Sequence, residues 1–379
     1  MIDKFLLFPY YLTLKLRNAL FDKQLFCKSH EAEVPTVCVG NVTVGGTGKT
    51  PHTEMILRML LASAEWGGKN IAVLSRGYKR KSKGFQQVTC LRNASFYGDE
   101  PSQIKKKFPG VTVALDKDRV RGCHYLCHPE IVRTSRKTRG CLDKDFPAAD
   151  IIILDDAFQY RKLKATINII LVDYNRPVSG DMLLPLGGLR DLPSHLKDAD
   201  IIIITKCPPY MTDWDKTVWA QSCGVKDFAT SSSSGVSATG KTQHVFFSTI
   251  KYCPPEPIYE ECDPRYVYSK RMVLFTGIAS DLPLRTYLCD TYQIADAFRF
   301  SDHHTFSDRD IRRITSSANT WSTAALATTE KDAQRVIASK KMPPALRKRL
   351  FQIPIEVDFM SDEERGIFRD TLFRAVRRS

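Results

Sequence analysis

Short apolar runs alternate with longer segments of helical periodicity along this chain. Each run is almost continuously apolar, which is typical of strands that are buried on both faces of a parallel sheet. The runs are Thr36–Val39, Ile71–Leu74, Val111–Leu115, Ile151–Leu154, Ile169–Val172 and Ile201–Thr205. Alternation of such strands with helices predicts an α/β protein whose mostly parallel sheet carries helices on both faces.

The pattern changes in the second half of the chain. Residues 209–242 become polar, which indicates a linker or a surface excursion. A new apolar run at Met272–Phe275 then begins a second α/β unit, and a length of 379 residues suits two domains. The predicted divisions are an N-terminal helix at 1–28, a core at 29–208 with a polar insert near 123–146, a linker and excursion at 209–270, and a smaller C-terminal α/β domain at 271–379.

The N-terminus is apolar and aromatic, but its uncharged run is short. Phe5–Leu14 contains no charged residue, whereas a helix that spans a bilayer needs about 20 apolar residues. Basic residues follow the run at Lys15, Arg17, Lys23 and Lys28. We therefore expect an interfacial helix whose apolar side enters the membrane while its basic residues meet anionic headgroups. The alternative is a hydrophobic helix that packs on the protein's own core.

A glycine-rich turn follows the first apolar run and precedes a helical segment. Residues 40–51 read Gly-Asn-Val-Thr-Val-Gly-Gly-Thr-Gly-Lys-Thr-Pro, close to the phosphate-binding loop pattern. Thr43 replaces the first glycine of that pattern, and Gly45 and Gly46 can relax the turn instead. Such a loop surrounds phosphates with backbone amides, and we expect Lys49 to reach the β and γ phosphates and Thr50 to bind Mg²⁺. The predicted nucleotide-binding residues are Thr43, Val44, Gly45, Gly46, Thr47, Gly48, Lys49 and Thr50. The expected fold is therefore that of a P-loop NTPase.

Carboxylates occur at three places where a phosphotransferase needs them. A buried strand ends at Asp155–Asp156, a typical position for Mg²⁺ ligands opposite the loop lysine. A turn carries Asp99 and Glu100, and a later segment reads Asp302-His303-His304. A carboxylate oriented by a histidine can act as general base toward a sugar hydroxyl. The residues alone do not pair Asp99 with His303, because the two lie in different predicted domains.

Composition limits the choice of partners. The net charge is +14, which suits an anionic partner, but the basic residues are scattered and no nucleic-acid-binding arm is present. The 11 cysteines are odd in number and irregularly spaced, which indicates a reducing compartment. One group, Cys123-His124-x-x-Cys127-His128, has zinc-ligand residue types, but no second pair lies at finger spacing, and we expect a helix surface with half-buried thiols. No motif requires a protein partner.

An ordered set of motifs extends through nearly the whole chain. It comprises Gly40–Pro51, Leu74–Tyr78, Gly98–Pro101, Asp118–Arg119, Leu154–Gln159, Leu183–Arg190, Phe275–Ala279, Asp302–His303 and Thr328–Asp332. Each motif has low specificity alone, but in this order they resemble the tetraacyldisaccharide 4′-kinase family. The resemblance implies transfer of the γ-phosphate of ATP, with Mg²⁺, to the 4′-hydroxyl of a tetraacyldisaccharide 1-phosphate, forming lipid IVA. It also implies a peripheral enzyme on the cytoplasmic face of the inner membrane.

The resemblance assigns roles to individual positions. Lys49 and Thr50 resemble the phosphate and Mg²⁺ contacts, Asp99 the catalytic base, and His303 its orienting partner, with His304 as the alternative. The implied metal-binding acids are Glu100, Asp155 and Asp156, and the implied substrate-cleft residues are Arg76, Tyr78, Arg119 and Arg190.

Two other classes of protein remain as alternatives. One is a P-loop GTPase or metallochaperone-type switch, although Thr205-Lys206-Cys207 lacks the usual guanine-reading pattern. The other is a membrane adaptor that retains the loop without catalysis.

Overall fold

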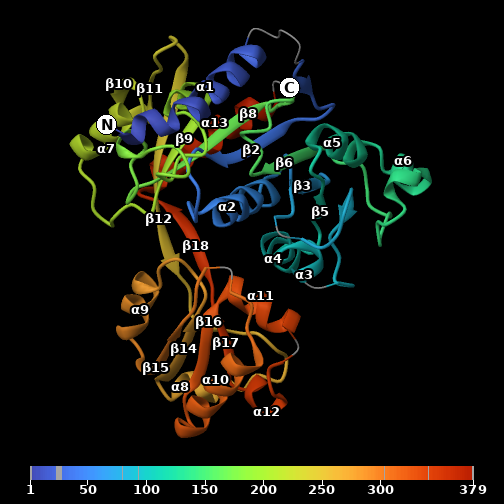
Figure 1. Ribbon diagram of the computed structural model, residues 1–379, viewed down its shortest axis with the longest axis vertical. Coiled ribbons are helices and arrows are strands. Elements are labelled where there is room, and N and C mark those ends of the chain that lie inside the picture. The colour runs from blue at the N-terminus through green and yellow to red at the C-terminus, as the bar shows by residue number, and fades with distance from the viewer. Residues whose placement is uncertain are drawn as a thin grey trace.

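The computed structural model describes residues 2–22, 28–78, 80–92, 94–302, 304–339 and 341–377 of the chain. It contains a larger lobe, drawn at the top of Figure 1, and a smaller lobe below it. An 11-stranded sheet forms the centre of the larger lobe and a 5-stranded sheet that of the smaller lobe. Helices cover both faces of the large sheet, so the predicted fold class is confirmed.

Six parallel strands form the middle of the large sheet. In spatial order they are β9 (Ile201–Thr205), β8 (Ile167–Asp173), β2 (Thr36–Asn41), β6 (Ile151–Asp155), β3 (Ile71–Ser75) and β5 (Thr112–Leu115). They coincide with the six apolar runs and are buried along almost their whole length. The register aligns Val39 with Asp155 and Leu74 with Leu154. The carboxyl ends of β2, β6 and β3 therefore meet at one edge, where open α/β sheets bind their ligands.

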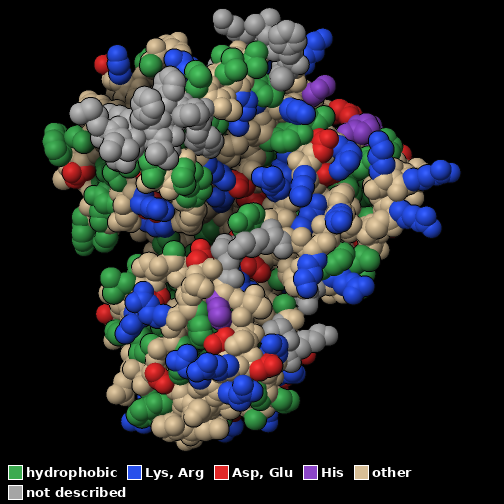
Figure 2. Space-filling view, viewed as in Figure 1, with side chains coloured by type: hydrophobic (Ala, Val, Ile, Leu, Met, Phe, Trp, Pro, Cys, Tyr) green, Lys and Arg blue, Asp and Glu red, His purple; other side chains and the backbone are tan. Residues whose placement is uncertain are grey.

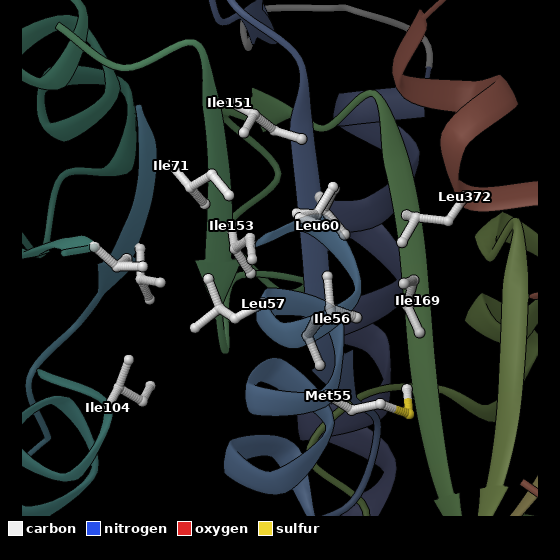
Figure 3. Packing of buried hydrophobic residues seen from close by; sticks show 14 of the residues in the cluster. Met55, Ile56, Leu57, Leu60, Ile71, Ile104, Ile151, Ile153, Ile169 and Leu372 are labelled. Carbon is white, nitrogen blue, oxygen red and sulfur yellow. The ribbon is translucent and has the colours of Figure 1, made fainter. Parts of the chain in front are cut away.

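One face of the large sheet is covered by α2 (Lys49–Leu61), α4 (Asp99–Lys107) and α13 (Asp362–Arg377). Figure 3 shows Ile56, Leu57 and Leu60 of α2 among the strand residues Ile153 and Ile169. These residues are fully buried. Burying a large aliphatic side chain contributes roughly 1.5–3 kcal/mol, so this packing fixes the first turn of α2 at the edge of the sheet.

The opposite face is covered in part by α5 (Arg119–Cys127), α6 (Pro129–Thr134) and the short turn η1 (Arg136–Thr138). Tyr125, Leu126, Val132 and Phe146 are buried there against the sheet. The 123–146 segment, predicted as a polar insert, is thus partly a packed layer of the core, because most of its apolar residues are buried, with Leu142 as an exposed exception.

Much of the stretch 209–270, predicted as a linker and excursion, forms regular elements of the larger lobe. The helix α7 (Asp213–Ser222) precedes β10 (Lys226–Ala229), β11 (Ser234–Val236) and β12 (Thr242–Tyr252), and these strands extend the large sheet beyond β9. A strand at the edge of a sheet has one unpaired edge that is open to solvent, and polar side chains are common there. The polar composition of this stretch therefore reflects its place at the sheet edge. The other edge ends at β4 (Gln86–Gln87).

The C-terminal boundary also differs from the prediction, because the chain returns to the larger lobe. The strand β18 (Ile355–Phe359) pairs with β12 in an antiparallel ribbon, from Ser248 opposite Phe359 to Tyr252 opposite Ile355. Figure 1 shows these two strands joining the lobes. The helix α13 then packs its Phe368 and Leu372 into the core of the larger lobe. Residues 271–379 are consequently shared between the two lobes.

The smaller lobe lies between β12 and β18 in the sequence. Its sheet has the order β13 (Glu256–Pro257), β17 (Leu350–Ile353), β16 (Ala325–Thr329), β14 (Arg271–Thr276) and β15 (Gln293–Arg299). Its helices are α8 (Arg265–Tyr268), α9 (Leu282–Cys289), α10 (Asp308–Thr320), α11 (Glu330–Ser339) and α12 (Pro344–Arg347). The remaining short elements of the larger lobe are α3 (Ala94–Tyr97), η2 (Val178–Gly180), η3 (Pro193–Asp198), η4 (Thr230–Ser232), and the paired β1 (His30–Glu31) and β7 (Leu163–Lys164).

The first helix, α1 (Ile2–Asp22), lies on the larger lobe. Leu14 is buried in an apolar cluster of that lobe, and the buried Asn18 lies 2.8 Å from His195 Nε2. Leu12 and Leu16, by contrast, are more than half exposed. Among the helices in the described part of the chain, none combines the length and apolarity needed to cross a bilayer.

Candidate active site

The glycine-rich turn between β2 and α2 has the backbone shape of a phosphate-binding loop. Gly45 and Gly48 adopt φ values of 104° and 88°, where other residues are strained. Asn41 fastens the turn, because its side-chain amide donates to Thr43 O at 2.7 Å and to Thr47 Oγ1 at 2.9 Å. A second connection runs from Val44 N to Gly188 O at 2.7 Å. No pattern in the sequence indicates this role for Asn41.

The loop lysine points to the ends of the strands. Lys49 Nζ lies 3.2 Å from Asn41 Oδ1 and 3.7 Å from Asp156 Oδ1. Burial lowers the pKa of Lys49, and the charges of Asp156 and Asp155 oppose that shift. The ammonium is thus held beside carboxylates at the N-terminus of α2, where helix geometry favours an anion. Thr50 follows it in the first turn and is partly exposed.

The two adjacent carboxylates occupy different environments. Asp155 is 6% exposed and accepts a hydrogen bond from Ser75 Oγ at 2.9 Å. Burial, followed by the charge of Asp156, raises the pKa of Asp155 to about 6. Burial also acts to raise the pKa of Asp156, but its bond to Arg190 and the charge of Lys49 outweigh that effect and the pKa falls. Asp155 is therefore a carboxylate that an added cation would stabilise.

The turn with the predicted catalytic base lies where the lobes meet. Asp99 is the first residue of α4, after Gly98 with φ 107°. Arg335 of α11 donates from Nε to Asp99 Oδ2 at 2.8 Å, and Lys331 of the same helix lies 2.9 Å from Glu100 Oε1. The Glu100 charge also acts on Lys49 and Asp155. The turn therefore stands between the phosphate-binding loop and the smaller lobe.

Two motifs of the smaller lobe converge on Arg335. Its Nη1 donates to Asp332 Oδ1 at 2.7 Å and to Gly277 O at 3.2 Å. Asp332 Oδ2 in turn accepts from Gly277 N at 2.8 Å. The Phe275–Ala279 and Thr328–Asp332 motifs thus orient the arginine that contacts Asp99. The sequence analysis does not include Arg335: the i,i+3 spacing from Asp332 in the first turn of α11 indicates only the Asp332 pair, not the contact with Asp99.

The predicted partner of Asp99, His303, lies outside the described residues. Its neighbour His304 bonds through Nε2 to Asp310 Oδ2 at 2.9 Å and stacks on Phe300 with ring centroids 4.6 Å apart. A side-chain carbon added to Gly277 would lie 3.4 Å from His304 Cβ and from Ser301 O. The described residues on both sides of position 303 therefore border the Gly277–Arg335 network.

The four predicted substrate residues divide into two pairs. Arg76 and Tyr78 are exposed beyond the end of β3. Arg119 is only 2% exposed, and its guanidinium donates to the backbone oxygens of Asp116 and Asp155. Arg190 forms an ion pair with Asp156. Arg76 and Tyr78 are thus open to a ligand, whereas Arg119 and Arg190 hold the strand end in place.

A glycine loop with its lysine, an adjacent carboxylate pair at the next strand end and a separate carboxylate at the lobe boundary define a P-loop phosphotransferase. A sequence model of the family described as tetraacyldisaccharide-1-P 4′-kinase matches residues 5–373. The chain belongs to this family. It is accordingly a kinase of lipid A biosynthesis, as the sequence predicts, and the GTPase and adaptor alternatives lose their basis.

Individual relatives cover almost the whole chain. The tetraacyldisaccharide 4′-kinase of Phocaeicola vulgatus is 36% identical over 370 residues, which make up 96% of this chain and 92% of that protein. The enzyme of Porphyromonas gingivalis is 34% identical over 372 residues, 96% of this chain and 93% of its own. A crystal structure of LpxK from Aquifex aeolicus in complex with ATP matches with a TM-score of 0.68 and 24% identity, covering 99% of this chain and all of that one. This likeness supports the fold.

Proposed function

We propose that this chain transfers the γ-phosphate of ATP to the 4′-hydroxyl of a tetraacyldisaccharide 1-phosphate and so forms a lipid IVA product. The observation that carries the assignment of residues is the position of Asp99. Its carboxylate begins a helix beside the phosphate-binding loop and at the same time contacts Arg335 of the smaller lobe. A group at that position can meet both a terminal phosphate and an acceptor sugar.

The phosphate-binding loop supplies the positioning. Amides of residues 45–50 and the Lys49 ammonium neutralise the triphosphate, which is the main task of a protein in phosphoryl transfer. Asn41 keeps the loop in shape, since it connects Thr43 with Thr47. Arg190 and Lys49 share Asp156, so both cations remain oriented before the nucleotide arrives.

The donors near the loop suit Mg²⁺. Thr50, Asp155, Asp156 and Glu100 offer only oxygen atoms, which this cation prefers. Burial, followed by the charge of Asp156, raises the pKa of Asp155 to about 6, so a cation beside it would stabilise the ionised carboxylate. When bound there, Mg²⁺ would neutralise charge on the transferred phosphate. We assign Asp155 and Asp156 to its primary site and Glu100 to its surroundings.

Asp99 is the general base in this proposal. It accepts the proton of the 4′-hydroxyl as the sugar oxygen attacks the γ-phosphorus, and the bond from that phosphorus to the bridging oxygen of ADP breaks. Arg335 fixes the orientation of the carboxylate through its 2.8 Å bond. His303 remains our proposed second partner of Asp99, because Ser301 and His304 border the same network.

The lipid substrate suits the surfaces near the loop and α1. Arg76 and Tyr78 are exposed, and a guanidinium binds a sugar phosphate in a bidentate manner. The exposed Leu12 and Leu16 of α1, with Lys15 between them, suit an interfacial helix at the cytoplasmic face of the inner membrane. The acyl chains could then stay in the bilayer while the sugar reaches the loop.

The test is transfer of labelled γ-phosphate from ATP to a tetraacyldisaccharide 1-phosphate in detergent. The wild type should label the acceptor, and Asp99→Asn should lose about 100-fold or more in kcat while ATP affinity is retained. Lys106→Gln, an exposed change on the same helix, is the matched control and should leave kcat unchanged. Full turnover by Asp99→Asn would exclude this residue as base, and failure of the wild type to label the acceptor would exclude the reaction itself.

A further inference from the structure

A compact group of one glutamate and two histidines lies on the larger lobe, apart from the phosphate-binding loop. Glu33 comes from the segment between β1 and β2, and His124 and His128 lie one helical turn apart at the end of α5. One ligand atom from each residue lies within 4.8 Å of the other two. In Figure 2, purple histidine and red acidic side chains adjoin at the upper right, over α5.

The contacts within this group are direct. Glu33 Oε1 lies 3.1 Å from His124 Nδ1, and Glu33 Oε2 lies 2.7 Å from His128 Nε2. The two imidazole rings have centroids 4.7 Å apart. All three side chains are between one third and just over one half exposed. A small ion can therefore reach the group from solvent without any rearrangement of the core.

A fourth residue completes the arrangement. Glu130 Oε1 lies 3.1 Å from His128 Nδ1, on the side of the ring opposite to Glu33. Histidines that bind metals usually donate their second ring N–H to a carboxylate, which fixes the tautomer and turns the other nitrogen toward the ion. Glu130 thus does for His128 what such a carboxylate does in known metal sites.

We propose that Glu33, His124 and His128 bind a divalent transition metal ion of the Zn²⁺ class, with water at the remaining position. Zinc takes imidazole nitrogen and carboxylate oxygen at about 2.0–2.2 Å, which separates tetrahedral ligands by about 3.3 Å. The 3.1 and 2.7 Å separations from Glu33 need to widen by about 0.2 and 0.6 Å to reach that spacing. Imidazole ligands favour Zn²⁺ and Cu²⁺ over Mg²⁺.

This site differs from the cysteine-based group considered from the sequence. Cys123 is 2% exposed within an apolar cluster, and Cys127 is not part of the group of converging ligand atoms. The ligand that the sequence did not reveal is Glu33, which lies 91 residues before His124. Only the packing of α5 beside the segment that leads into β2 brings the three together.

A bound ion would fasten two parts of the larger lobe. The segment with Glu33 leads directly into β2 and the phosphate-binding loop, while α5 begins at Arg119, which donates to the backbone of Asp155. A ligand that binds only the folded state raises thermal stability by mass action. The proposed ion would therefore act as a structural clamp between these two segments.

The test uses the full-length chain without a histidine tag, in detergent and with excess Mg²⁺ to cover Asp155 and Asp156. Zn²⁺ is titrated against a chromophoric chelator, and Tm is measured with and without Zn²⁺. We expect one zinc per chain and a higher Tm with zinc. His124→Asn and Glu33→Gln should each weaken zinc binding by about tenfold or more and lose the Tm increase.

Two matched variants separate this site from its surroundings. His30→Asn changes an exposed histidine outside the group, and Cys127→Ser removes the neighbouring thiol; both should bind zinc as the wild type does. Co²⁺ should give visible d–d absorption without a thiolate charge-transfer band. Absence of stoichiometric zinc in the wild type, equal affinity in His124→Asn, or loss of zinc in Cys127→Ser would each overturn the proposal.

Discussion

Removal of the Lys107 ammonium should destabilise the protein through a buried charge network that joins both lobes. Lys107 of α4 lies 2.8 Å from Glu54 Oε2 of α2 and 2.5 Å from Glu330 Oε1 of α11. Glu54 and Glu330 are 1% and 4% exposed. In Lys107→Met both carboxylates remain buried and lose the cation between them.

The magnitude follows from what each carboxylate keeps. Removing one partner of a buried ion pair costs about 3–5 kcal/mol. Glu54 retains the amide of Gln103 at 2.8 Å and the guanidinium of Arg58 at 3.7 Å, and Glu330 retains Ile355 N at 3.2 Å. We therefore expect the lower end of that range, about 3 kcal/mol, in the free energy of unfolding measured by urea titration at pH 8.

The loss of unfolding free energy in Lys107→Met should be larger at high pH than at low pH. Burial raises the pKa of Glu330 above its usual 4.5, and Lys107 opposes that rise. Without Lys107 the pKa should rise further, and an acid with a higher pKa in the folded chain binds more protons when folded. Stability of Lys107→Met should therefore fall as pH increases above 4.5, more steeply than that of the wild type, so the deficit is smaller at pH 5 than at pH 8.

Two comparisons decide whether this reasoning holds. Lys106→Met removes an exposed lysine from the same helix and should change stability by less than about 0.5 kcal/mol. Glu330→Gln combined with Lys107→Met should recover part of the loss, because one unpaired charge is gone. A Lys107→Met deficit no larger than that of Lys106→Met, or one that does not change between pH 5 and pH 8, would refute the argument.

Three further predictions concern the active site. Arg335→Lys should lower kcat with little change in the KM for ATP, because the Nε bond that orients Asp99 is lost. Steady-state kinetics with both substrates measure this effect, and an unchanged kcat would contradict it. Asn41→Ala should raise the KM for ATP about tenfold, since the two bonds that shape the loop disappear; nucleotide titration checks this, and wild-type affinity would exclude the clamp. Mg²⁺ affinity should fall as pH decreases through about 6, because protonation removes the Asp155 charge; Asp155→Asn should abolish that dependence, and a persisting dependence would assign it to another group.

The sequence alone predicts the elements in which nearly every residue is apolar. All six apolar runs became central strands, because a strand buried on both faces requires apolar residues at every position. The polar strands β10 and β11 could not be recognised this way, since an edge strand has no such requirement. The return of α13 to the larger lobe depends on tertiary packing of Phe368 and Leu372, which no local pattern encodes.

The site was predictable wherever one motif contains the chemistry. Lys49 and the Asp155–Asp156 pair meet because parallel strands align their carboxyl ends. Asp99 and Arg335 are 236 positions apart and lie in different lobes. Their spacing along the chain therefore does not predict their contact. The resemblance implies that Arg119 lies in the substrate cleft, whereas its burial and its bonds to the backbone oxygens of Asp116 and Asp155 have no signal in the sequence pattern.

The β12–β18 ribbon makes the smaller lobe an insertion with adjacent ends. The chain leaves the larger lobe through β12 and returns through β18, and Cys253 N bonds to Pro354 O at 2.9 Å where the two strands end. A paired ladder resists sliding of one strand along the other, because every shift in register breaks its bonds. Bending of the two-stranded ribbon out of its own plane breaks none of these hydrogen bonds. Any movement of the smaller lobe relative to the larger lobe should therefore follow one arc, and Arg335 would return to Asp99 along that arc.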